Sequence, residues 1–370
     1  MYDKRRRLIA PSELPILADP PDPLAFRDGR KVSTAAAWEE RAEELTELYQ
    51  HYMFGFIPDR SEERVDQETT ENGLLIKVTA RGKEAAFPVE VSLPTPDCGF
   101  EGPYPVILSL GDFEPDNAIA RGYAVVTLKT DTIASDNAAR TGAFFGLYPY
   151  VPKTDTDIGA LLAWGWAAGK VLDALERDAY PEIDPKKAAI TGFSRWGKAA
   201  LIAGAMDKRF KVVNPHCSGA GGLASFRRSF EGKMYYWGIA ERSEPLEALQ
   251  SESEAHWFNS TFGEFEDVRS LPFDQHELAA LVAPRGLLAT GGYADYWTNP
   301  EGMYVSYLGA ARVYELLDAA DRIGIAFRPG GHGRTQEDHD NLLDFCDREF
   351  RGFRCGKSFK SSLYDGYSSR

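Results

Sequence analysis

The feature that most constrains this chain is a Gly-Phe-Ser turn at residues 192–194. A short apolar run ends at this turn, and an alanine-rich, helix-forming run follows over residues 199–205. A serine at such a strand-to-helix turn is lifted out of the backbone. The free N–H groups of the helix N-terminus then point at any oxyanion that forms beside it. The turn therefore favours acyl transfer from Ser194.

The spacing around Ser194 differs from the common Gly-x-Ser-x-Gly pattern. Trp196 stands where the second glycine is expected, and Gly197 follows one residue later. A Gly-x-Ser tripeptide alone is weak evidence, since serine is also a frequent helix N-cap. The choice between a nucleophile and a simple N-cap therefore depends on partner residues elsewhere in the chain.

Composition narrows the class of protein. The 370 residues are 43% hydrophobic, which is enough for a large buried core in one unit. The net charge of −14 argues against a nucleic acid partner, because phosphate binding needs a basic face. We also expect no membrane partner, because no run approaches the roughly 18 consecutive apolar residues of a membrane span. The four cysteines have no metal-ligand spacing and fit free thiols.

The N-terminal sequence does not have the apolar core of a signal peptide. Met1 to Ala10 is rich in charge, and prolines follow. We therefore expect a cytoplasmic protein, or a secreted one whose signal has been removed. The basic cluster over residues 4–7 is expected to be a solvated surface segment.

Short apolar runs alternate with helix-forming stretches along most of the chain. Strands are expected over residues 74–79, 87–93, 105–110, 123–128, 210–214, 286–290 and 325–327, and in the run that ends at residue 192. Helices are expected over residues 35–52, 157–176, 199–205, 304–317 and 337–350. This alternation predicts a three-layer α/β sandwich, in which helices cover both faces of a mostly parallel sheet.

We expect a single domain over residues 1–370. Residues 1–70 would form an N-terminal arm and helix, and residues 356–370 a mobile polar tail. Residues 218–275 are long, irregular and rich in aromatic and charged side chains. Such a segment is typical of a lid or substrate-binding loop inserted into an α/β protein.

A nucleophilic serine needs a base to accept its proton and an acid to orient that base. In α/β-hydrolases the chain order is Ser, then Asp or Glu, then His. His332 lies between glycines after an apolar strand, in a loop that can present an imidazole into a cleft. His339 falls within the last helix beside two aspartates, where a solvated face is expected. His332 is the favoured base, and the alternative is a turn histidine without a role.

The acid is expected in the loop after the preceding strand. Asp295 follows a strand and a double glycine there, and its alternative role is that of an Asx-turn or helix-start residue. Ser194, Asp295 and His332 have the right chain order, and each follows a strand. Together they predict an α/β-hydrolase fold with a Ser-His-Asp triad.

Residues 192–198, Gly-Phe-Ser-Arg-Trp-Gly-Lys, resemble the Gly-x-Ser-Arg-x-Gly-Lys signature of the glucuronoyl esterases, carbohydrate esterase family 15. Further stretches resemble other regions of that family, at residues 22–26, 38–41, 271–276, 283–285 and 295–302. The resemblance spans roughly residues 20–350. It implies hydrolysis of (4-O-methyl-)glucuronic acid esters, as in lignin–carbohydrate linkages, through an acyl-enzyme. It implies no metal or cofactor, glucuronoxylan as the carbohydrate partner, and a monomer.

The resemblance also implies roles for four further residues. Arg195 would stabilise the oxyanion with its side chain and its backbone N–H, and Lys198 would bond sugar hydroxyls. Trp297 would line the uronate pocket with its ring against a sugar face, and Glu254 would be another sugar-contacting residue. The alternatives are a solvated first helical turn for Arg195 and Lys198, and core packing for Trp297.

Two positions depart from the family pattern. Cys217 stands where some members carry the catalytic Glu, so the orienting role would pass to Asp295. Phe193 replaces a cysteine that forms a disulfide in fungal members, and both changes suit a bacterial-type enzyme. Two other functions stay open, namely another carbohydrate esterase of acetyl xylan or feruloyl type, and a non-catalytic sugar-binding relative.

Overall fold

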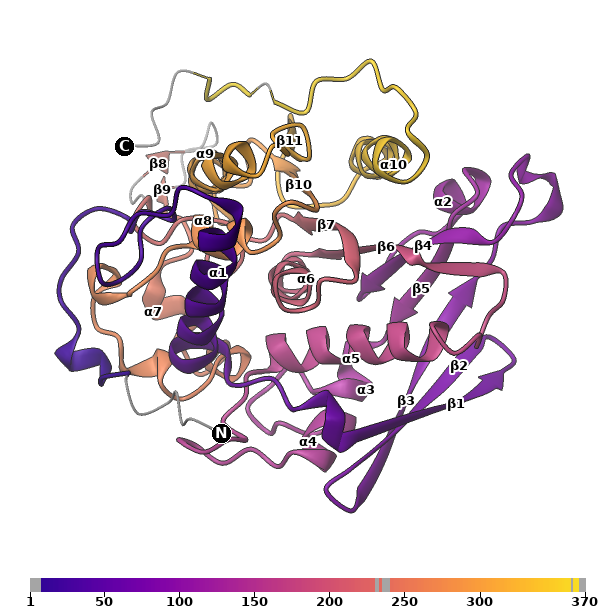
Figure 1. Ribbon diagram of the computed structural model, residues 1–370, viewed down its shortest axis with the longest axis horizontal. Helices are drawn as coiled ribbons and strands as arrows, with labels where there is room; N and C mark the ends of the chain where they lie inside the picture. The colour runs from indigo at the N-terminus through magenta and orange to yellow at the C-terminus, as the bar shows by residue number, and fades with distance from the viewer. Residues whose placement is uncertain (1–7, 230–232, 235–239, 361, 366–370) are drawn as a thin grey trace.

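The computed structural model describes residues 8–229, 233–234, 240–360 and 362–365, so the basic cluster at 4–7 and part of the expected tail lie outside it. A nine-stranded sheet in the order β1-β2-β3-β5-β4-β6-β7-β10-β11 forms the centre (Figure 1). Its strands are β1 (Glu63–Thr70), β2 (Gly73–Ala80), β3 (Lys83–Ser92), β4 (Tyr104–Leu110), β5 (Ala124–Leu128), β6 (Ile183–Phe193), β7 (Phe210–His216), β10 (Gly286–Gly292) and β11 (Ile323–Arg328). The first three strands form an antiparallel meander that joins β5, and from β5 to β11 all neighbours run parallel.

Helices cover both faces of this sheet, which confirms the expected α/β architecture. The helices are α1 (Ala35–Tyr49), α2 (Asp116–Ala120), α3 (Thr130–Ile133), α4 (Ala143–Leu147), α5 (Ala160–Leu175), α6 (Arg195–Met206), α7 (Leu246–Leu249), α8 (Gln275–Ala280), α9 (Pro300–Leu316) and α10 (Gln336–Arg351). Shorter elements are the 3₁₀ turns Pro11–Glu13, Arg60–Glu62, Pro96–Cys98, Ala255–Trp257, Phe262–Glu264 and Val268–Ser270, and the ribbon of β8 (Lys233–Met234) and β9 (Ala240–Glu241). None of the described helices has the length and apolar character that a membrane crossing requires.

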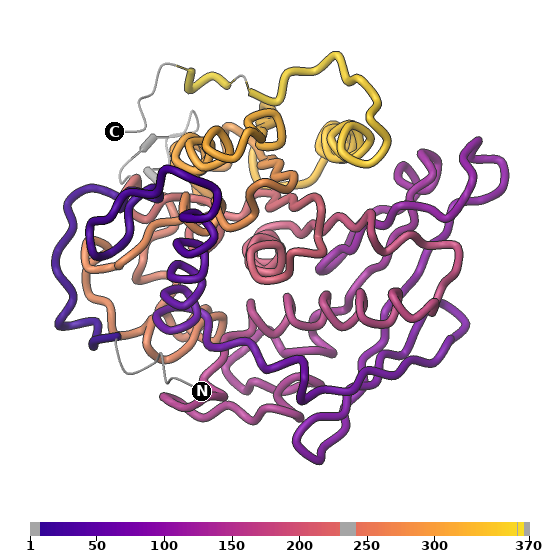
Figure 2. The backbone as a smooth tube through the Cα atoms, in the orientation of Figure 1, coloured from indigo at the N-terminus to yellow at the C-terminus, as the bar shows by residue number. Residues whose placement is uncertain are grey.

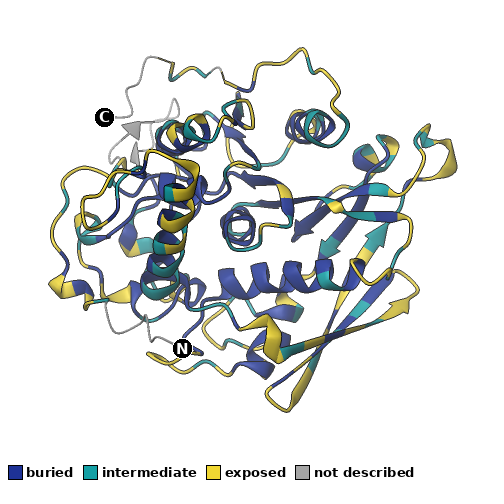
Figure 3. Ribbon diagram, viewed as in Figure 1, coloured by how far each residue is buried: buried dark blue, intermediate teal, exposed yellow. Residues whose placement is uncertain are grey.

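The central strands are apolar throughout because both of their faces are buried. Successive side chains of a strand point to opposite faces. In β4, Val106 and Leu108 join the core that contains α5 and α6, whereas Ile107 joins a second core that contains α10. Figure 3 shows α5, α6 and the central strands buried almost throughout. A rigid layer therefore lies beneath the carboxyl ends of the parallel strands.

The N-terminal helix packs against a segment that is distant in sequence. Figure 2 shows α1, in indigo, beside the orange chain that leads into α8. Arg41 donates to Glu277 at 2.6 Å, and the Tyr49 hydroxyl donates to the carbonyl of Asp274 at 2.9 Å. The α-helix expected over 35–52 ends at Tyr49, and a π-helical turn over Gln50–Phe54 follows it.

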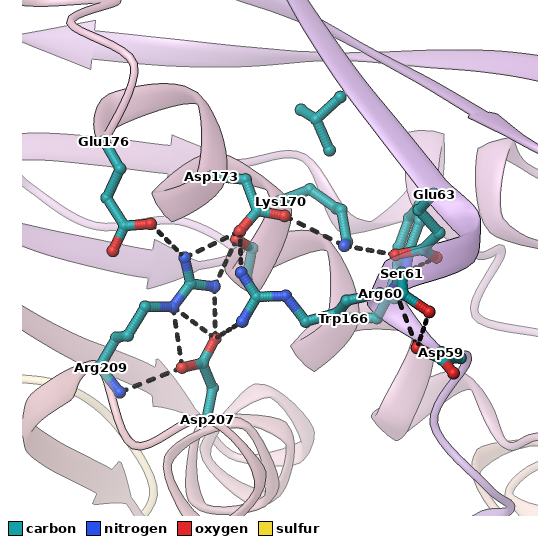
Figure 4. Close-up of polar contacts among 12 residues, drawn as sticks. Asp59, Arg60, Ser61, Glu63, Trp166, Lys170, Asp173, Glu176, Asp207 and Arg209 are labelled. Carbon is teal, nitrogen blue, oxygen red and sulfur yellow. Dashed lines mark hydrogen bonds and ion pairs between the residues drawn. The ribbon is translucent and has the colours of Figure 1, made fainter.

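A cluster of charged residues joins β1 to the carboxyl half of α5 (Figure 4). We call Glu63, Lys170, Asp173, Asp207 and Arg209 the α5 cluster. Lys170 binds Glu63 and lies 3.1 Å from Asp173, and Arg209 contacts Asp173 at 2.8 Å and Asp207 at 2.6 Å. The cluster ties the edge meander to α5 and to the end of α6. The sequence did not predict β1, because this edge strand is mostly polar and lacks an apolar run.

Candidate active site

The topology brings the candidate catalytic residues together. Ser194 follows β6, Cys217 follows β7, Asp295 lies in the loop after β10, and His332 in the loop after β11. These four strands are parallel neighbours in the sheet, so their carboxyl ends meet at one edge. Residues separated by more than a hundred positions therefore share one site.

Ser194 occupies a strained turn. Its backbone has φ 60° and ψ −124°, a conformation that residues other than glycine rarely adopt. Its N–H donates to the carbonyl of His216 at 3.0 Å, and its own carbonyl accepts the first bond of α6, from Lys198 N at 3.1 Å. The following N–H groups at the start of α6 have no partner within the helix and are available to an anion.

Two glycines allow this turn, and they explain the shifted motif. A Cβ at position 192 would lie 2.2 Å from the carbonyl oxygen of Trp196. A Cβ at position 197 would lie 2.6 Å from the carbonyl oxygen of His216, on β7. The second glycine is thus required at 197, because that position faces β7. The Trp196 ring instead covers Gly111, where a Cβ would meet it at 2.6 Å.

Asp295 and His332 form a hydrogen-bonded pair. The His332 Nδ1 lies 2.8 Å from Asp295 Oδ2, and the two side chains are 42% and 2% exposed. Burial raises the pKa of Asp295, but the hydrogen bond and charge of His332 outweigh it and keep that pKa below its ordinary value. Asp295 is therefore a carboxylate whose hydrogen bond can fix the imidazole tautomer.

The imidazole of His332 packs against Phe193, with ring centroids 4.5 Å apart. Ser194 and His332 line the same cavity. Among the hydrogen bonds between described residues, none joins the Ser194 hydroxyl to His332. Such bonds are often long in free enzymes and tighten when substrate binds.

Cys217 lies behind the acid. Its side chain is fully buried, and burial, followed by the charge of Asp295, raises the pKa of the thiol. The thiol therefore stays protonated beside Asp295, and its Sγ lies 3.6 Å from His216 Nε2. The ligand atoms of Cys217, Asp295 and His332 lie within 4.8 Å of one another, which is close enough for a metal ion. The thiol is protonated, and His332 Nδ1 is already hydrogen-bonded to Asp295. This arrangement suits hydrogen bonding better than metal binding.

A cavity of about 270 Å³ lies beside the elbow. Its walls contain six of the seven predicted site residues, and Asp295 lies behind His332. The lining residues are Ser194, Arg195, Lys198, Glu244, Ser253, Glu254, Trp257, Trp297, Thr298 and His332. Trp297 is 39% exposed, so it belongs to the cavity wall rather than to the core.

Lys198 is buried and paired, and does not belong to a solvated helical turn. It is 3% exposed, and its Nζ lies 2.6 Å from Glu244 Oε2 and 2.5 Å from the carbonyl of Ala220. An ammonium group has three N–H donors. Two are used by the protein, and the third is left for the cavity.

Besides the predicted Glu254, the cavity contains a second glutamate, Glu244, which the sequence did not predict. Glu244 lies in the irregular segment between β7 and β10, where no motif marks it. Burial raises its pKa, against the opposing effect of Lys198. Burial and the charge of Glu244 raise the pKa of Glu254 to about 7. Glu254 Oε2 is buried and has no hydrogen-bond partner among the described residues. A buried acceptor of this kind is a natural contact for a ligand hydroxyl.

Arg195 is partly exposed at the cavity wall, with its side chain 42% accessible. Its guanidinium forms an ion pair with Asp136, which lies in the loop after α3. Asp136 could not be identified from the sequence, because a single aspartate in a loop carries no motif.

Two other histidines have structural positions. His339 was expected on a solvated face, and this is wrong, because the ring is buried against Phe113 with centroids 4.7 Å apart. His216 is fully buried, and its nitrogens lie 2.8 Å from Thr290 Oγ1 and 3.0 Å from the carbonyl of Gly333. Burial lowers its pKa to about 3, so it is neutral and holds the loop that carries His332.

The sheet, the elbow and the Asp295–His332 pair define an α/β-hydrolase with the groups of a serine hydrolase. The family model for "Glucuronyl esterase, fungi" matches residues 76–318. A solved glucuronoyl esterase of carbohydrate esterase family 15 from Caldicellulosiruptor kristjansonii, a bacterial neighbour, superposes with a TM-score of 0.91. It is 50% identical, and the match covers 97% of this chain and 98% of that one.

Two curated relatives give the same family. A multidomain esterase from Ruminococcus flavefaciens is 35% identical over 376 residues, covering 96% of this chain and 49% of the relative. A 4-O-methyl-glucuronoyl methylesterase from Podospora anserina is 32% identical over 308 residues, covering 82% of this chain and 61% of the relative. The chain thus spans about half the length of the first relative. It belongs to the glucuronoyl esterase family, which confirms the resemblance seen at residues 192–198.

Proposed function

We propose that this protein is a serine carboxylester hydrolase that cleaves esters of (4-O-methyl-)glucuronic acid. The observation that carries the proposal is the cavity itself, which combines Ser194 and His332 with two cations, two glutamates and a partly exposed tryptophan. Relatives named glucuronoyl esterase or 4-O-methyl-glucuronoyl methylesterase support a uronate as the acyl group.

Acylation begins when the Ser194 oxygen attacks the ester carbonyl carbon and His332 accepts the hydroxyl proton. The carbonyl oxygen becomes an oxyanion at the N-terminus of α6, where backbone N–H groups and Arg195 stabilise it. A single such donor is worth about 10²–10³ in kcat. His332 then gives its proton to the leaving alcohol as the ester C–O bond breaks, and the uronoyl group remains on Ser194.

Deacylation repeats these steps with water. His332 removes a proton from the water molecule, whose oxygen attacks the uronoyl carbonyl carbon. The second tetrahedral intermediate collapses, Ser194 regains its proton from His332, and the free uronate leaves. Throughout, the Asp295 carboxylate keeps Nδ1 protonated and stabilises the imidazolium.

The acyl-side contacts are assigned to residues around Ser194. Lys198 offers its remaining N–H, and Glu254 offers an unpaired Oε2 to sugar hydroxyls. Trp297 presents its ring to a sugar face. Acetyl groups are too small to reach these contacts, so their binding energy serves a uronate ester selectively.

The test is a comparison of esters with the same leaving group. A glucuronate ester, an acetyl ester and a feruloyl ester are assayed with wild type and with Ser194→Ala as the control. We expect the highest kcat/KM with the glucuronate ester. A preference for the acetyl or feruloyl ester would assign the protein to another carbohydrate esterase class. No turnover and no labelling by a covalent serine probe would indicate a non-catalytic sugar-binding relative.

We further propose that the natural substrate is the glucuronate ester of a glucuronoxylan, and that the protein acts as a monomer. Incubation with esterified glucuronoxylan should release free uronate side groups without shortening the xylan chain. Light scattering should give a mass near 41.1 kDa. A dimer mass, or release only from small esters, would refute these two points.

A further inference from the structure

The carboxylate of Asp136 receives donors from three separate side chains. Its Oδ2 binds Arg195 Nη1 in an ion pair, and its Oδ1 accepts from Trp257 Nε1 at 2.6 Å and lies 2.9 Å from His256 Nε2. Arg195 begins α6, and the other two donors belong to the 3₁₀ turn Ala255–Trp257 of the inserted segment. One carboxylate therefore joins Arg195 to the inserted segment, which supplies Trp257 to the cavity wall.

The loop that carries Asp136 is held in place. Trp164 Nε1, from α5, donates to the carbonyl of Ala134 at 2.8 Å. Arg140 donates to the carbonyl of Ile158 at 2.8 Å and to that of Phe258 at 3.0 Å. The second contact ties this loop to the same inserted segment. Asp136 is thus a fixed anchor rather than a surface charge that happens to lie near an arginine.

Asp136 is charged at neutral pH. Burial raises its pKa, but the hydrogen bonds of His256 and Trp257 and the charge of Arg195 outweigh burial and bring the pKa to about 2. His256 Nε2 lies 2.9 Å from Asp136 Oδ1, and His256 Nδ1 is buried and has no hydrogen-bond partner among the described residues.

Neighbouring side chains orient the Arg195 guanidinium. Its Cζ lies 5.6 Å from the Trp196 ring centroid and 5.8 Å from that of Trp257. Asp136 uses one of the five N–H donors of Arg195, and the others are left for the cavity that Arg195 lines. Without an anchor, a side chain that is 42% exposed would sample many rotamers.

We propose that Asp136 is a positioning residue for Arg195. Its carboxylate holds the guanidinium where the oxyanion forms, and through His256 and Trp257 it couples that cation to the inserted segment. The inference rests on the proposed function, because it assumes that Arg195 acts in ester hydrolysis. Misplacement of a catalytic group by about 1 Å can cost on the order of 10² in rate, so the coupling has a measurable effect.

The experiment is a double-mutant cycle of Asp136→Asn and Arg195→Ala, with kcat and KM measured on p-nitrophenyl acetate and on a methyl glucuronate ester. Asp136→Asn is expected to lower kcat about 10- to 100-fold with KM changed less than about threefold, because the loss is in the transition state. In the Arg195→Ala background the same change should cost less than about twofold, because its only route to the chemistry has been removed.

Two further variants separate positioning from folding. Asp155→Asn breaks a surface ion pair with Arg81, in which both side chains are more than 40% exposed, and should leave kcat unchanged. Asp136→Glu keeps the charge and is expected to recover at least half of the loss in log kcat. If Asp136→Asn does not fold, Asp136→Glu completes the cycle in its place.

The outcomes are distinct. Wild-type kcat in Asp136→Asn, or equal losses in both Arg195 backgrounds, would overturn the inference while the proposed function stands. Turnover of p-nitrophenyl acetate without turnover of the glucuronate ester would overturn the proposed substrate, and the cycle on the acetate would still decide the role of Asp136. Turnover of neither ester would overturn both.

Discussion

Two buried lysines lie on neighbouring helices, one within the α5 cluster and the other at the cavity beside Ser194. Lys170 of α5 and Lys198 of α6 are 2% and 3% exposed, and each binds a glutamate whose side chain is buried. In the α5 cluster, Glu63 also accepts from Trp166 Nε1 and from the Tyr148 hydroxyl, both at 2.7 Å (Figure 4). None of the cluster's buried side-chain atoms is among those left without a partner in the described chain.

Around Lys198, by contrast, one buried hydrogen-bond acceptor of the described residues is left unsatisfied. The Lys198 partner Glu244 has a raised pKa, and next to it Glu254 Oε2 has no hydrogen-bond partner among the described residues. Both glutamates line the cavity beside Ser194. Charge burial alone therefore does not mark a functional site. A buried polar atom that faces a cavity and lacks a hydrogen-bond partner is the better indicator of such a site, because buried polar atoms are normally hydrogen-bonded within the protein.

The largest expected effect is on kcat, from a change at Ser194, which lies at the start of α6. Ser194→Ala should lower kcat by about 10⁶, because no other group can form the acyl-enzyme. The Tm should stay within a few degrees of wild type, since only one partly exposed hydroxyl at the cavity wall is lost. Steady-state kinetics and labelling by a covalent serine probe check this. Activity above a small fraction of wild type would exclude Ser194 as the nucleophile.

Asp295→Asn should lower kcat by about 10⁴. An amide in place of the carboxylate favours the wrong imidazole tautomer, and the imidazolium loses its counter-charge. The measurement is kcat on the glucuronate ester across pH 6–9. If Cys217→Ala proves more damaging than Asp295→Asn, the assignment of the acid is incorrect.

Lys170→Met should cost about 3–5 kcal/mol of unfolding free energy and leave kcat of the folded protein unchanged. The change leaves the buried Glu63 without its cation. Urea denaturation measures the loss. Lys77→Met is the matched control, since its pair with Glu68 is 32% and 59% exposed and is worth about 0–1 kcal/mol. A drop in kcat for Lys170→Met would mean that the α5 cluster also serves the chemistry.

Lys198→Ala should raise the barrier for glucuronate esters by about 1–3 kcal/mol in kcat/KM, through one lost charge-assisted hydrogen bond to the sugar. Hydrolysis of a small acetyl ester should change little. We expect a smaller stability loss than for Lys170→Met, because the pKa of Glu244 is already raised and this carboxyl can take up a proton. Equal losses on both esters would favour the acetyl esterase class.

Cys217→Ala should have the smallest effect, below about tenfold in kcat, or roughly 1 kcal/mol. It removes a neutral thiol beside Asp295, whose carboxylate keeps its hydrogen bond with His332. Titration of wild type with a thiol reagent should give slow modification of Cys217, because burial raises the pKa of that thiol. Fast modification coupled to loss of activity would contradict the assigned position.

Much of the fold followed from local patterns. Central strands such as β4 and β5 are continuous apolar runs, and these are recognisable because both faces of the sheet are covered. The polar edge strand β1 lacks such an apolar run. It becomes a strand only by pairing with β2. The burial of His339 was also missed, because neighbouring aspartates suggested solvent while Phe113 comes from a distant loop.

Chain order and the spacing around the serine motif predicted Ser194, His332 and Asp295 as nucleophile, base and acid, and they identified the family. These signals are local, since a strained turn needs glycines at fixed offsets and each catalytic residue follows a strand. Tertiary structure alone decided the partners of Arg195 and Lys198. Asp136 and Glu244 carry no motif, and they meet Arg195 and Lys198 only after the loop behind α3, α6 and the inserted segment have packed together. Burial, pairing and pKa belong to that assembled environment, and no sequence window contains it.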